Sequence, residues 1–134
     1  MKFLVLGDIF PTAINKLKNK LPKLIKKNNI DFVIANGENA AKDANGITKK
    51  EAKELFNSGI DVLTSGNHIW DKKETIEFIE KENRLLRPAN LVNGSPGRGY
   101  KIYFSKNKKF KIGVINLMGN VFMRKTDDVF KIAK

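Results

Sequence analysis

The sequence predicts an α/β protein built on a parallel sheet. Three short apolar runs, residues 3–6, 31–35 and 60–63, have the length and composition of buried strands. A segment with the apolar spacing of a helix follows each run. Strands that alternate with helices in this way form parallel sheets with right-handed crossovers.

The first expected strand, residues 3–6, ends close to an acid, Asp8. Thr12 is suited to cap the next helix, and Pro22 should kink or interrupt it. That helix would bury one apolar face and leave its lysines in solvent. The apolar face consists of Ile14, Leu17, Leu21 and Leu24.

The second expected strand, residues 31–35, is followed directly by the polar segment 36–39. A polar loop comes next, and then Thr48 and Glu51 have the spacing of a capping box that opens a helix. Gly59 should end this helix. A second group of polar side chains therefore lies just past a strand end.

The third expected strand, residues 60–63, leads into Gly66, Asn67 and His68, and His68 is the only histidine of the chain. Asp71 is the kind of residue that starts a helix. Further on, residues 100–104 and 110–115 predict an antiparallel strand pair joined by a lysine-rich turn. Residues 119–134 predict no defined element.

Composition limits the functions that the chain can have. Its 134 residues, 41% of them hydrophobic, predict one domain over residues 1–134. The absence of cysteine excludes a thiolate metal site, so a metal would need Asp, Glu, Asn, His or water. The first apolar run is too short for a signal peptide, and no segment approaches a membrane span. We expect a cytoplasmic protein without membrane contact.

The net charge of +12 suggests nucleic-acid binding as one hypothesis, because basic surfaces attract phosphates. The lysines are spread over several segments, however, and aromatic residues do not alternate with them as a base-stacking surface requires. We therefore favour a solvated lysine-rich surface. A small basic RNA-binding protein, or weak RNA contact through this surface, remains an alternative.

Polar side chains follow each of the three expected strands, and parallel strands place these ends at one edge of the sheet. Carboxylate and amide oxygens there suit hard divalent ions. Two such ions about 3.5–4 Å apart would activate a water and hold a phosphoryl group. Singly, each side chain also has a structural explanation as a turn or cap acid, a turn amide or a loop histidine.

Three segments resemble successive motifs of the calcineurin-like metallophosphoesterases. They are Gly-Asp at residues 7–8, Asn-Gly-Glu-Asn-Ala-Ala at 36–41 and Gly-Asn-His-Ile-Trp-Asp at 66–71. With residues 87–90, 95–99 and 114–117, they are most similar to the bacterial YmdB-like branch, whose members are cyclic-nucleotide phosphodiesterases. The resemblance implies a partial four-layer α/β/β/α sandwich with a parallel βαβ start, in a chain cut short at its C-terminal end.

By position, the resemblance implies that Asp8 and Asn39 bind a first metal, Glu38 bridges two metals and Asn67 binds the second. His68 would donate a proton to the leaving oxygen, which an imidazole titrating near neutrality can do. The implied cofactor is a divalent pair, iron or manganese first and magnesium or zinc as alternatives. The implied partners are a phosphoester or cyclic-nucleotide substrate, such as a 2',3'-cyclic nucleotide, and further copies in a homo-oligomer.

The predicted function is metal-dependent phosphodiester hydrolysis by an activated water. The family completes its metal site with several histidines from a later segment, whereas this chain has His68 alone. A truncated, catalytically silent homologue is therefore the main alternative. Trp70 is expected to pack behind the site rather than stack on a substrate. Arg87 and Arg98 are weaker candidates for binding phosphate.

Overall fold

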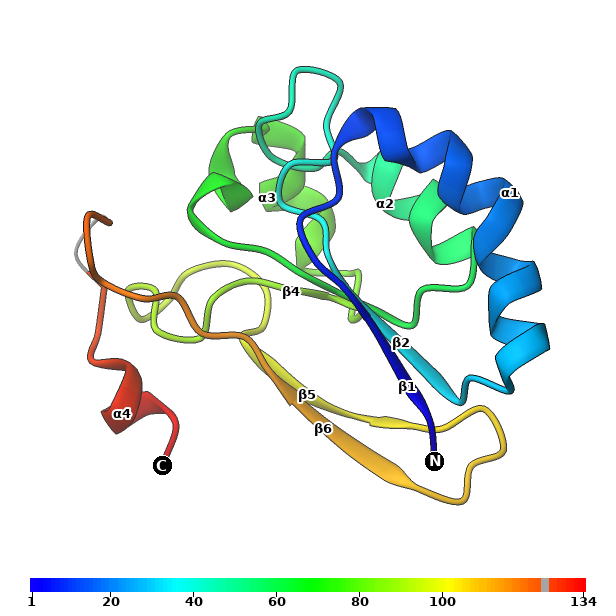
Figure 1. Cartoon of the computed structure of the whole chain (residues 1–134). Coiled ribbons are helices and arrows are strands. Elements are labelled where there is room, and N and C mark those ends of the chain that lie inside the picture. The colour runs from blue at the N-terminus through cyan, green and yellow to red at the C-terminus, as the bar shows by residue number, and fades with distance from the viewer. Residues whose placement is uncertain (124–125) are drawn as a thin grey trace.

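The structure is a computed structural model that describes residues 1–123 and 126–134 (Figure 1). Its first part comprises β1 (Phe3–Leu6), α1 (Pro11–Asn28), β2 (Phe32–Asn36), α2 (Lys49–Asn57) and β3 (Val62–Thr64). Next come a 3-10 helix, η1 (Asn67–Trp70), then α3 (Lys73–Ile79), β4 (Leu85–Leu86), β5 (Tyr100–Phe104), β6 (Lys111–Ile115) and α4 (Val129–Ile132).

The central sheet has the strand order β1-β2-β3-β4, and all three strand pairs are parallel. Helices α1, α2 and α3 lie on one face of it, and the β5–β6 hairpin lies on the other (Figure 1). The described residues thus form the layers α/β/β. The predicted mixed α/β fold with a parallel start is confirmed.

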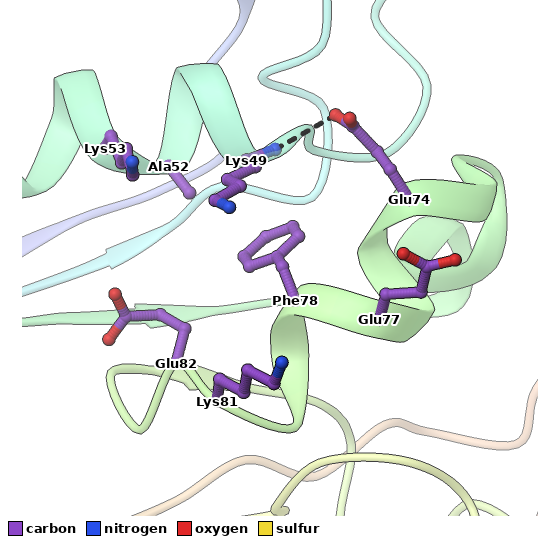
Figure 2. A pocket seen from close by; sticks show the side chains of 8 residues that line it. All are labelled: Lys49, Ala52, Lys53, Glu74, Glu77, Phe78, Lys81 and Glu82. Carbon is purple, nitrogen blue, oxygen red and sulfur yellow. Dashed lines mark hydrogen bonds between the residues drawn. The ribbon is translucent and has the colours of Figure 1, made fainter.

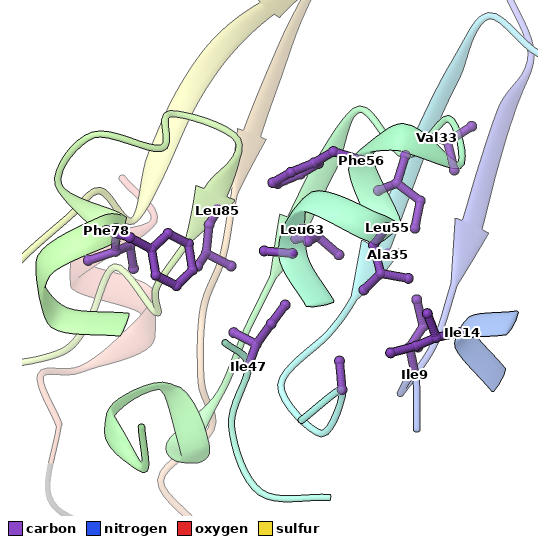
Figure 3. Close-up of a cluster of buried hydrophobic side chains, with 14 of the residues drawn as sticks. Ile9, Ile14, Val33, Ala35, Ile47, Leu55, Phe56, Leu63, Phe78 and Leu85 are labelled. Carbon is purple, nitrogen blue, oxygen red and sulfur yellow. The ribbon is translucent and has the colours of Figure 1, made fainter. Parts of the chain in front are cut away.

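The main core lies between the sheet and its helices. Val33, Ala35 and Leu63 project from the strands and are fully buried against Leu55 of α2 (Figure 3). Phe78 of α3 lies in the same cluster, next to Leu85 in the view of Figure 3. Removal of this apolar surface from water is the main stabilising term for the βα layer, at roughly 25 cal/mol per Å².

A smaller core lies between the sheet and the hairpin. The sheet contributes Phe32, Val62 and Leu86, and β6 contributes Ile112 and Val114. Residues on a strand point alternately to its two faces, so every second residue of the hairpin points away from this core. The outward residues include Tyr100, Ile102 and Phe104, which are exposed.

Helix α1 differs from the prediction at its start and on its apolar face. It begins at Pro11 after Phe10, so Thr12 lies inside the helix and does not cap it. Proline suits this first position because it has no N–H to leave unpaired. The helix continues through the exposed Pro22, so the predicted interruption is wrong.

The buried face of α1 also shifts by one residue at its end. Leu24 is 44% exposed, whereas Ile25 packs against the core. Ile25 lies four residues after the buried Leu21, and residues four apart share one face of a helix. The lysines of this helix are exposed, as predicted.

Strand β1 is an edge strand, not the fully buried strand that its composition predicted. Leu4 and Leu6 pack against the helix-side core, but Val5 is 69% exposed. Phe3 is also exposed and meets the ring of Phe32 edge-on at a centroid distance of 6.1 Å. Only one face of this strand is covered because the hairpin reaches the inner strands.

Strands β2 and β3 lie one to two residues later than predicted. Asp61 stays outside β3, and its carboxylate accepts a 2.7 Å hydrogen bond from the backbone N–H of Val33. Burial raises the pKa of Asp61 above its ordinary value. The backbone N–H of Asp61 donates to the carbonyl of Val33 at 2.9 Å, so the two residues are joined by two hydrogen bonds, which a residue-type pattern does not reveal.

The remaining elements mix confirmed and corrected predictions. Helix α2 starts after Thr48, and Gly59 follows its end with a φ of 107°, as the capping signals predicted. The Thr48 hydroxyl bonds the Glu51 carboxylate instead of a backbone N–H. Asp71 does not start a helix, because α3 begins at Lys73. Strand β4 was not predicted, since two residues carry no periodicity.

The hairpin is confirmed: β5 and β6 pair antiparallel, with Tyr100 opposite Ile115. Asn90 anchors the C-terminal tail. Its buried amide donates hydrogen bonds to the carbonyls of Met118 and Asp127. Among the described residues, no helix is long and apolar enough to cross a membrane.

Candidate metal centre

Asp8 follows β1 in a tight turn at the carboxyl edge of the sheet. Its φ of 39° is in the left-handed region, which aspartate and asparagine enter more readily than other side chains. The next residue, Ile9, donates its N–H to the carbonyl of Asn36 at 2.9 Å, which joins this turn to the end of β2. Non-glycine residues in this region cluster at functional sites.

Asn39 lies directly across from Asp8. Its amide Nδ2 donates a hydrogen bond of 2.6 Å to Asp8 Oδ1, so two predicted ligands of the first metal meet. The amide carbonyl of Asn39 is the oxygen that remains for a cation. The structure therefore brings the ends of β1 and β2 together, as the parallel topology predicted.

Glu38 is positioned by the turn that follows β2. Asn36 Oδ1 accepts the backbone N–H of Glu38 at 3.3 Å, and the N–H of Gly37 reaches the carbonyl of Thr64 at 3.0 Å. Asn36 is the last residue of β2, and its side-chain amide stabilises the turn that follows, which agrees with the structural explanation of this residue. These bonds direct the Glu38 side chain toward the end of β3.

The carboxylate of Glu38 lies against Gly66. A Cβ atom at Gly66 would overlap Glu38 Oε2, so any other residue at this position would require the Glu38 carboxylate to shift. Glu38 Oε2 is buried and has no hydrogen-bond partner, and it is the only such side-chain atom within residues 1–123 and 126–134. An unpaired buried carboxylate oxygen is costly, so this atom calls for a cation or a proton.

Asn67 and His68 lie on η1, directly after Gly66. His68 Nδ1 is 2.6 Å from Asp71 Oδ2. Asn67, His68 and Asp71 line a pocket of about 180 Å³ together with Phe122 and Met123. The pocket adds two apolar side chains from the tail to the predicted site.

Asp71 is the residue of the site that sequence reasoning missed, because its position before a helix suggested a capping role. A usable signal was its spacing, since an acid three residues after a histidine can reach the imidazole on a helical turn.

The loop of residues 42–46 packs against the turn that carries His68. Lys72 Nζ forms a 2.6 Å ion pair with Asp43 Oδ2, and this hydrogen bond lowers the pKa of Asp43. Gly46 has a φ of 82°, and a Cβ there would lie 3.0 Å from the carbonyl oxygen of His68. A glycine therefore allows the loop to approach the backbone of η1.

The donors at this edge fit a divalent cation in chemistry but are few. Two carboxylates, Asp8 and Glu38, are accompanied by the amides of Asn39 and Asn67, and hard cations prefer such oxygens. In the described part of the chain, no three His, Cys, Asp or Glu side chains are grouped closely enough to hold a metal. The ligand assignment stays a prediction.

The three weaker candidates, Trp70, Arg87 and Arg98, have different surroundings. Trp70 is half-buried and packs against the helix-side core, as predicted. Arg87 donates Nη1 to the carbonyl of Pro88 at 2.8 Å and Nε to that of Pro96 at 3.1 Å, so it holds a loop. Burial lowers the pKa of Arg87. Arg98 is exposed and pairs by its backbone with Leu86.

A larger groove, of about 390 Å³, lies between α2 and α3 (Figure 2). It contains no residue of the predicted site. Its charges balance, because three lysines face three glutamates around Phe78 (Figure 2). The larger cavity and the predicted site therefore lie at different places in the fold. The lining residues are Lys49, Ala52, Lys53, Glu74, Glu77, Phe78, Lys81 and Glu82.

Comparison with known proteins identifies the family of the chain. A family model described as YmdB-like protein matches residues 4–134. The 2',3'-cyclic-nucleotide 2'-phosphodiesterase of Bacillus subtilis is 43% identical over 131 residues, which are 97% of this chain and 48% of that protein.

Two crystal structures share the fold. One, of a hypothetical protein from Thermus thermophilus, has a TM-score of 0.89 at 30% identity and is matched over 99% of this chain and 51% of its own. The other, of a novel phosphatase from Mycoplasma pneumoniae, has a TM-score of 0.86 at 30% identity, over 99% of this chain and 49% of its own. The chain spans about half the length of the curated relatives it matches.

Proposed function

The chain belongs to the YmdB-like protein family, and from this premise we propose that it is a metal-dependent phosphodiesterase unit. Its substrate would be a phosphodiester such as a 2',3'-cyclic nucleotide, the substrate class in the name of the Bacillus subtilis relative. Iron or manganese would be the preferred cofactor, with magnesium or zinc as alternatives. Homo-oligomers are part of the same proposal.

The observation that carries this proposal is the buried Oε2 of Glu38, which has no hydrogen-bond partner among residues 1–123 and 126–134. The carboxylate of Asp8 and the amide oxygens of Asn39 and Asn67 are the other oxygen ligands of this proposal. A structural turn would leave no reason to hold a carboxylate oxygen out of water beside Gly66. A cation site gives that reason, because the positive charge compensates the buried oxygen.

Each residue has a task that follows from its position. Asp8, Glu38 and Asn39 would hold a cation at the ends of β1 and β2, and Asn67 would approach it from the end of β3. A bound divalent ion would supply Lewis-acid activation of water and neutralise charge on the phosphoryl group. His68, on the turn beside Asn67, would give its proton to the leaving oxygen.

The second candidate function is a homologue that binds one cation and does not turn over substrate. It is favoured by the single histidine of the chain and by the lack of a group of three acidic or histidine ligands among the described residues. One ion binds substrate phosphate but leaves half of a two-metal clamp unfilled. The two functions differ in turnover and agree in cation binding.

Hydrolysis of bis(p-nitrophenyl) phosphate and of a 2',3'-cyclic nucleotide by the manganese-loaded chain tests the proposal. We expect turnover above the metal blank, and we expect it to fall at least about a hundredfold in Glu38→Gln and His68→Ala. Glu77→Gln, an exposed acid of the α2–α3 groove, is the matched control and should keep the rate. Cation binding without turnover would support the silent homologue. Turnover above the metal blank that is equal in Glu38→Gln and the unmodified chain would contradict both functions.

A further inference from the structure

We infer that Asp71 is a positioning residue that holds the imidazole of His68 in one orientation and one tautomer. In that tautomer, Nδ1 carries the proton and donates it to Asp71, and Nε2 is the nitrogen left for a ligand or substrate. This inference deepens the proposed function, since it names the atom through which His68 would act. The inference rests on the proposed function only where it explains why the protein would hold His68 in this way.

The contact itself is short and specific. His68 Nδ1 and Asp71 Oδ2 are 2.6 Å apart, and the side chains are 35% and 38% exposed. In water-accessible places such a pair gains little by charge alone. Its value here is geometric, because a carboxylate on one ring nitrogen decides which nitrogen bears the proton.

The backbone around the pair is fixed on two sides. The N–H of Asp71 donates to the carbonyl of His68 at 3.1 Å, which closes the turn that carries both residues. From the other side, Gly46 packs against the same carbonyl, and the ion pair of Lys72 with Asp43 ties the loop down. Asp71 therefore meets His68 without any need for a long, mobile side chain.

The charges next to the pair leave Asp71 free for this role. Lys72, its neighbour in sequence, is paired with Asp43 at 2.6 Å and does not pair with Asp71 within the described residues. No other hydrogen bond to either ring nitrogen of His68 is formed in that same part of the chain. The Asp71 carboxylate is thus the group that selects the tautomer.

Nuclear magnetic resonance of nitrogen-15 in the imidazole tests the inference directly. His68 is the only histidine, so the ring signals of a uniformly labelled chain need no assignment. At about pH 9 an ordinary imidazole is neutral, and its two nitrogen shifts then report which one is protonated. We expect the unmodified chain to show a protonated Nδ1 and an unprotonated Nε2.

Three variants separate positioning from general damage. Asp71→Ala should return the ring to the mixed tautomers of free imidazole, whereas Asp71→Asn keeps an acceptor oxygen and should largely retain the Nδ1–H form. Asp43→Asn, which weakens the loop contact but leaves the acceptor in place, should also retain it. Amide signals of the rest of the chain show whether each variant is folded.

A dominant Nε2–H tautomer in the unmodified chain would overturn the inference, and so would an unchanged tautomer in folded Asp71→Ala. If a variant does not fold, the spectrum of the unmodified chain alone still decides the question. Failure of the phosphodiesterase assay would leave the tautomer result standing, because no turnover enters the measurement. The two claims therefore fail separately.

Discussion

Glu38 and Asp8 are carboxylates at the same edge of the sheet, yet their surroundings are opposite. Asp8 lies at the rim, is exposed, and accepts a hydrogen bond of 2.6 Å from Asn39. Glu38 lies inward against Gly66, and its buried Oε2 has no hydrogen-bond partner in the described part of the chain. The rim also holds the His68 and Asp71 pair, in which each side chain has its partner.

The difference separates structural polar contacts from a site that needs a ligand. At the rim, the two polar side chains of each contact satisfy each other, and such contacts would also form in a protein without catalytic function. The inner carboxylate costs stability until something positive binds it, because burial without a hydrogen bond is unfavourable. We therefore expect this one atom to reduce the stability of the metal-free chain, and the proposed cation site rests on it.

The largest effect is expected from Gly66→Ala, which places a methyl group where Glu38 Oε2 lies. The metal-free chain should lose about 1–3 kcal/mol of unfolding free energy, the usual cost of overpacking. Urea unfolding of the single variant and of Gly66→Ala combined with Glu38→Ala measures it. In the double variant the penalty should largely vanish, since the overlapping carboxylate is gone. An equal penalty in both backgrounds would contradict the close approach of Gly66 to Glu38.

An effect of opposite sign is expected from Glu38→Gln in the metal-free chain. A neutral amide costs less than a charge to leave unpaired, so the unfolding free energy should rise by about 1 kcal/mol. Asp8→Asn is the matched change at the rim. Asparagine also accepts the left-handed φ of 39° at that position, and no gain is expected there. Equal changes of the unfolding free energy in the two variants, measured by urea unfolding, would contradict the proposed difference between the exposed Asp8 and the buried Glu38 oxygen.

The smallest effect is expected from Asn39→Ala, which removes the rim hydrogen bond to Asp8. Because the bond is exposed, its loss should cost less than about 1 kcal/mol in thermal unfolding. Asn45→Ala, which removes an exposed 3.2 Å side-chain bond to the carbonyl of Asp43, is a control of the same kind. A loss of several kcal/mol in Asn39→Ala alone would mean that the rim, too, is structurally essential.

The parallel sheet and the convergence of its strand ends could be predicted from the sequence. Apolar runs that alternate with helical segments leave few other topologies, so Asp8 and Asn39 were expected to meet and do meet at 2.6 Å. The predictions that were wrong concern features that depend on neighbours distant in sequence. The edge position of β1, which exposes Val5, follows from which strand pairs with which.

At the candidate site, too, some features could be predicted from the sequence and others could not. Residue types at strand ends identified Glu38 as a candidate ligand, but no pattern could show that its Oε2 is buried and lacks a partner among the residues that the structure describes. Asp71 was interpreted as a helix start because caps and site acids are the same residue types. Its 2.6 Å contact with His68 depends on η1, a short 3-10 turn without a periodic signal.

Titration of the metal-free chain with manganese(II), followed by calorimetry, tests the central claim that this edge is a cation site. We predict one ion per chain. At a concentration about 100 times Kd, thermal unfolding should show about 2.7 kcal/mol of added stability. Binding should be lost in Glu38→Gln and weakened in Asp8→Asn, and it should persist in Glu77→Gln. Absence of binding, or binding that Glu38→Gln leaves unchanged, would contradict a cation site at this edge.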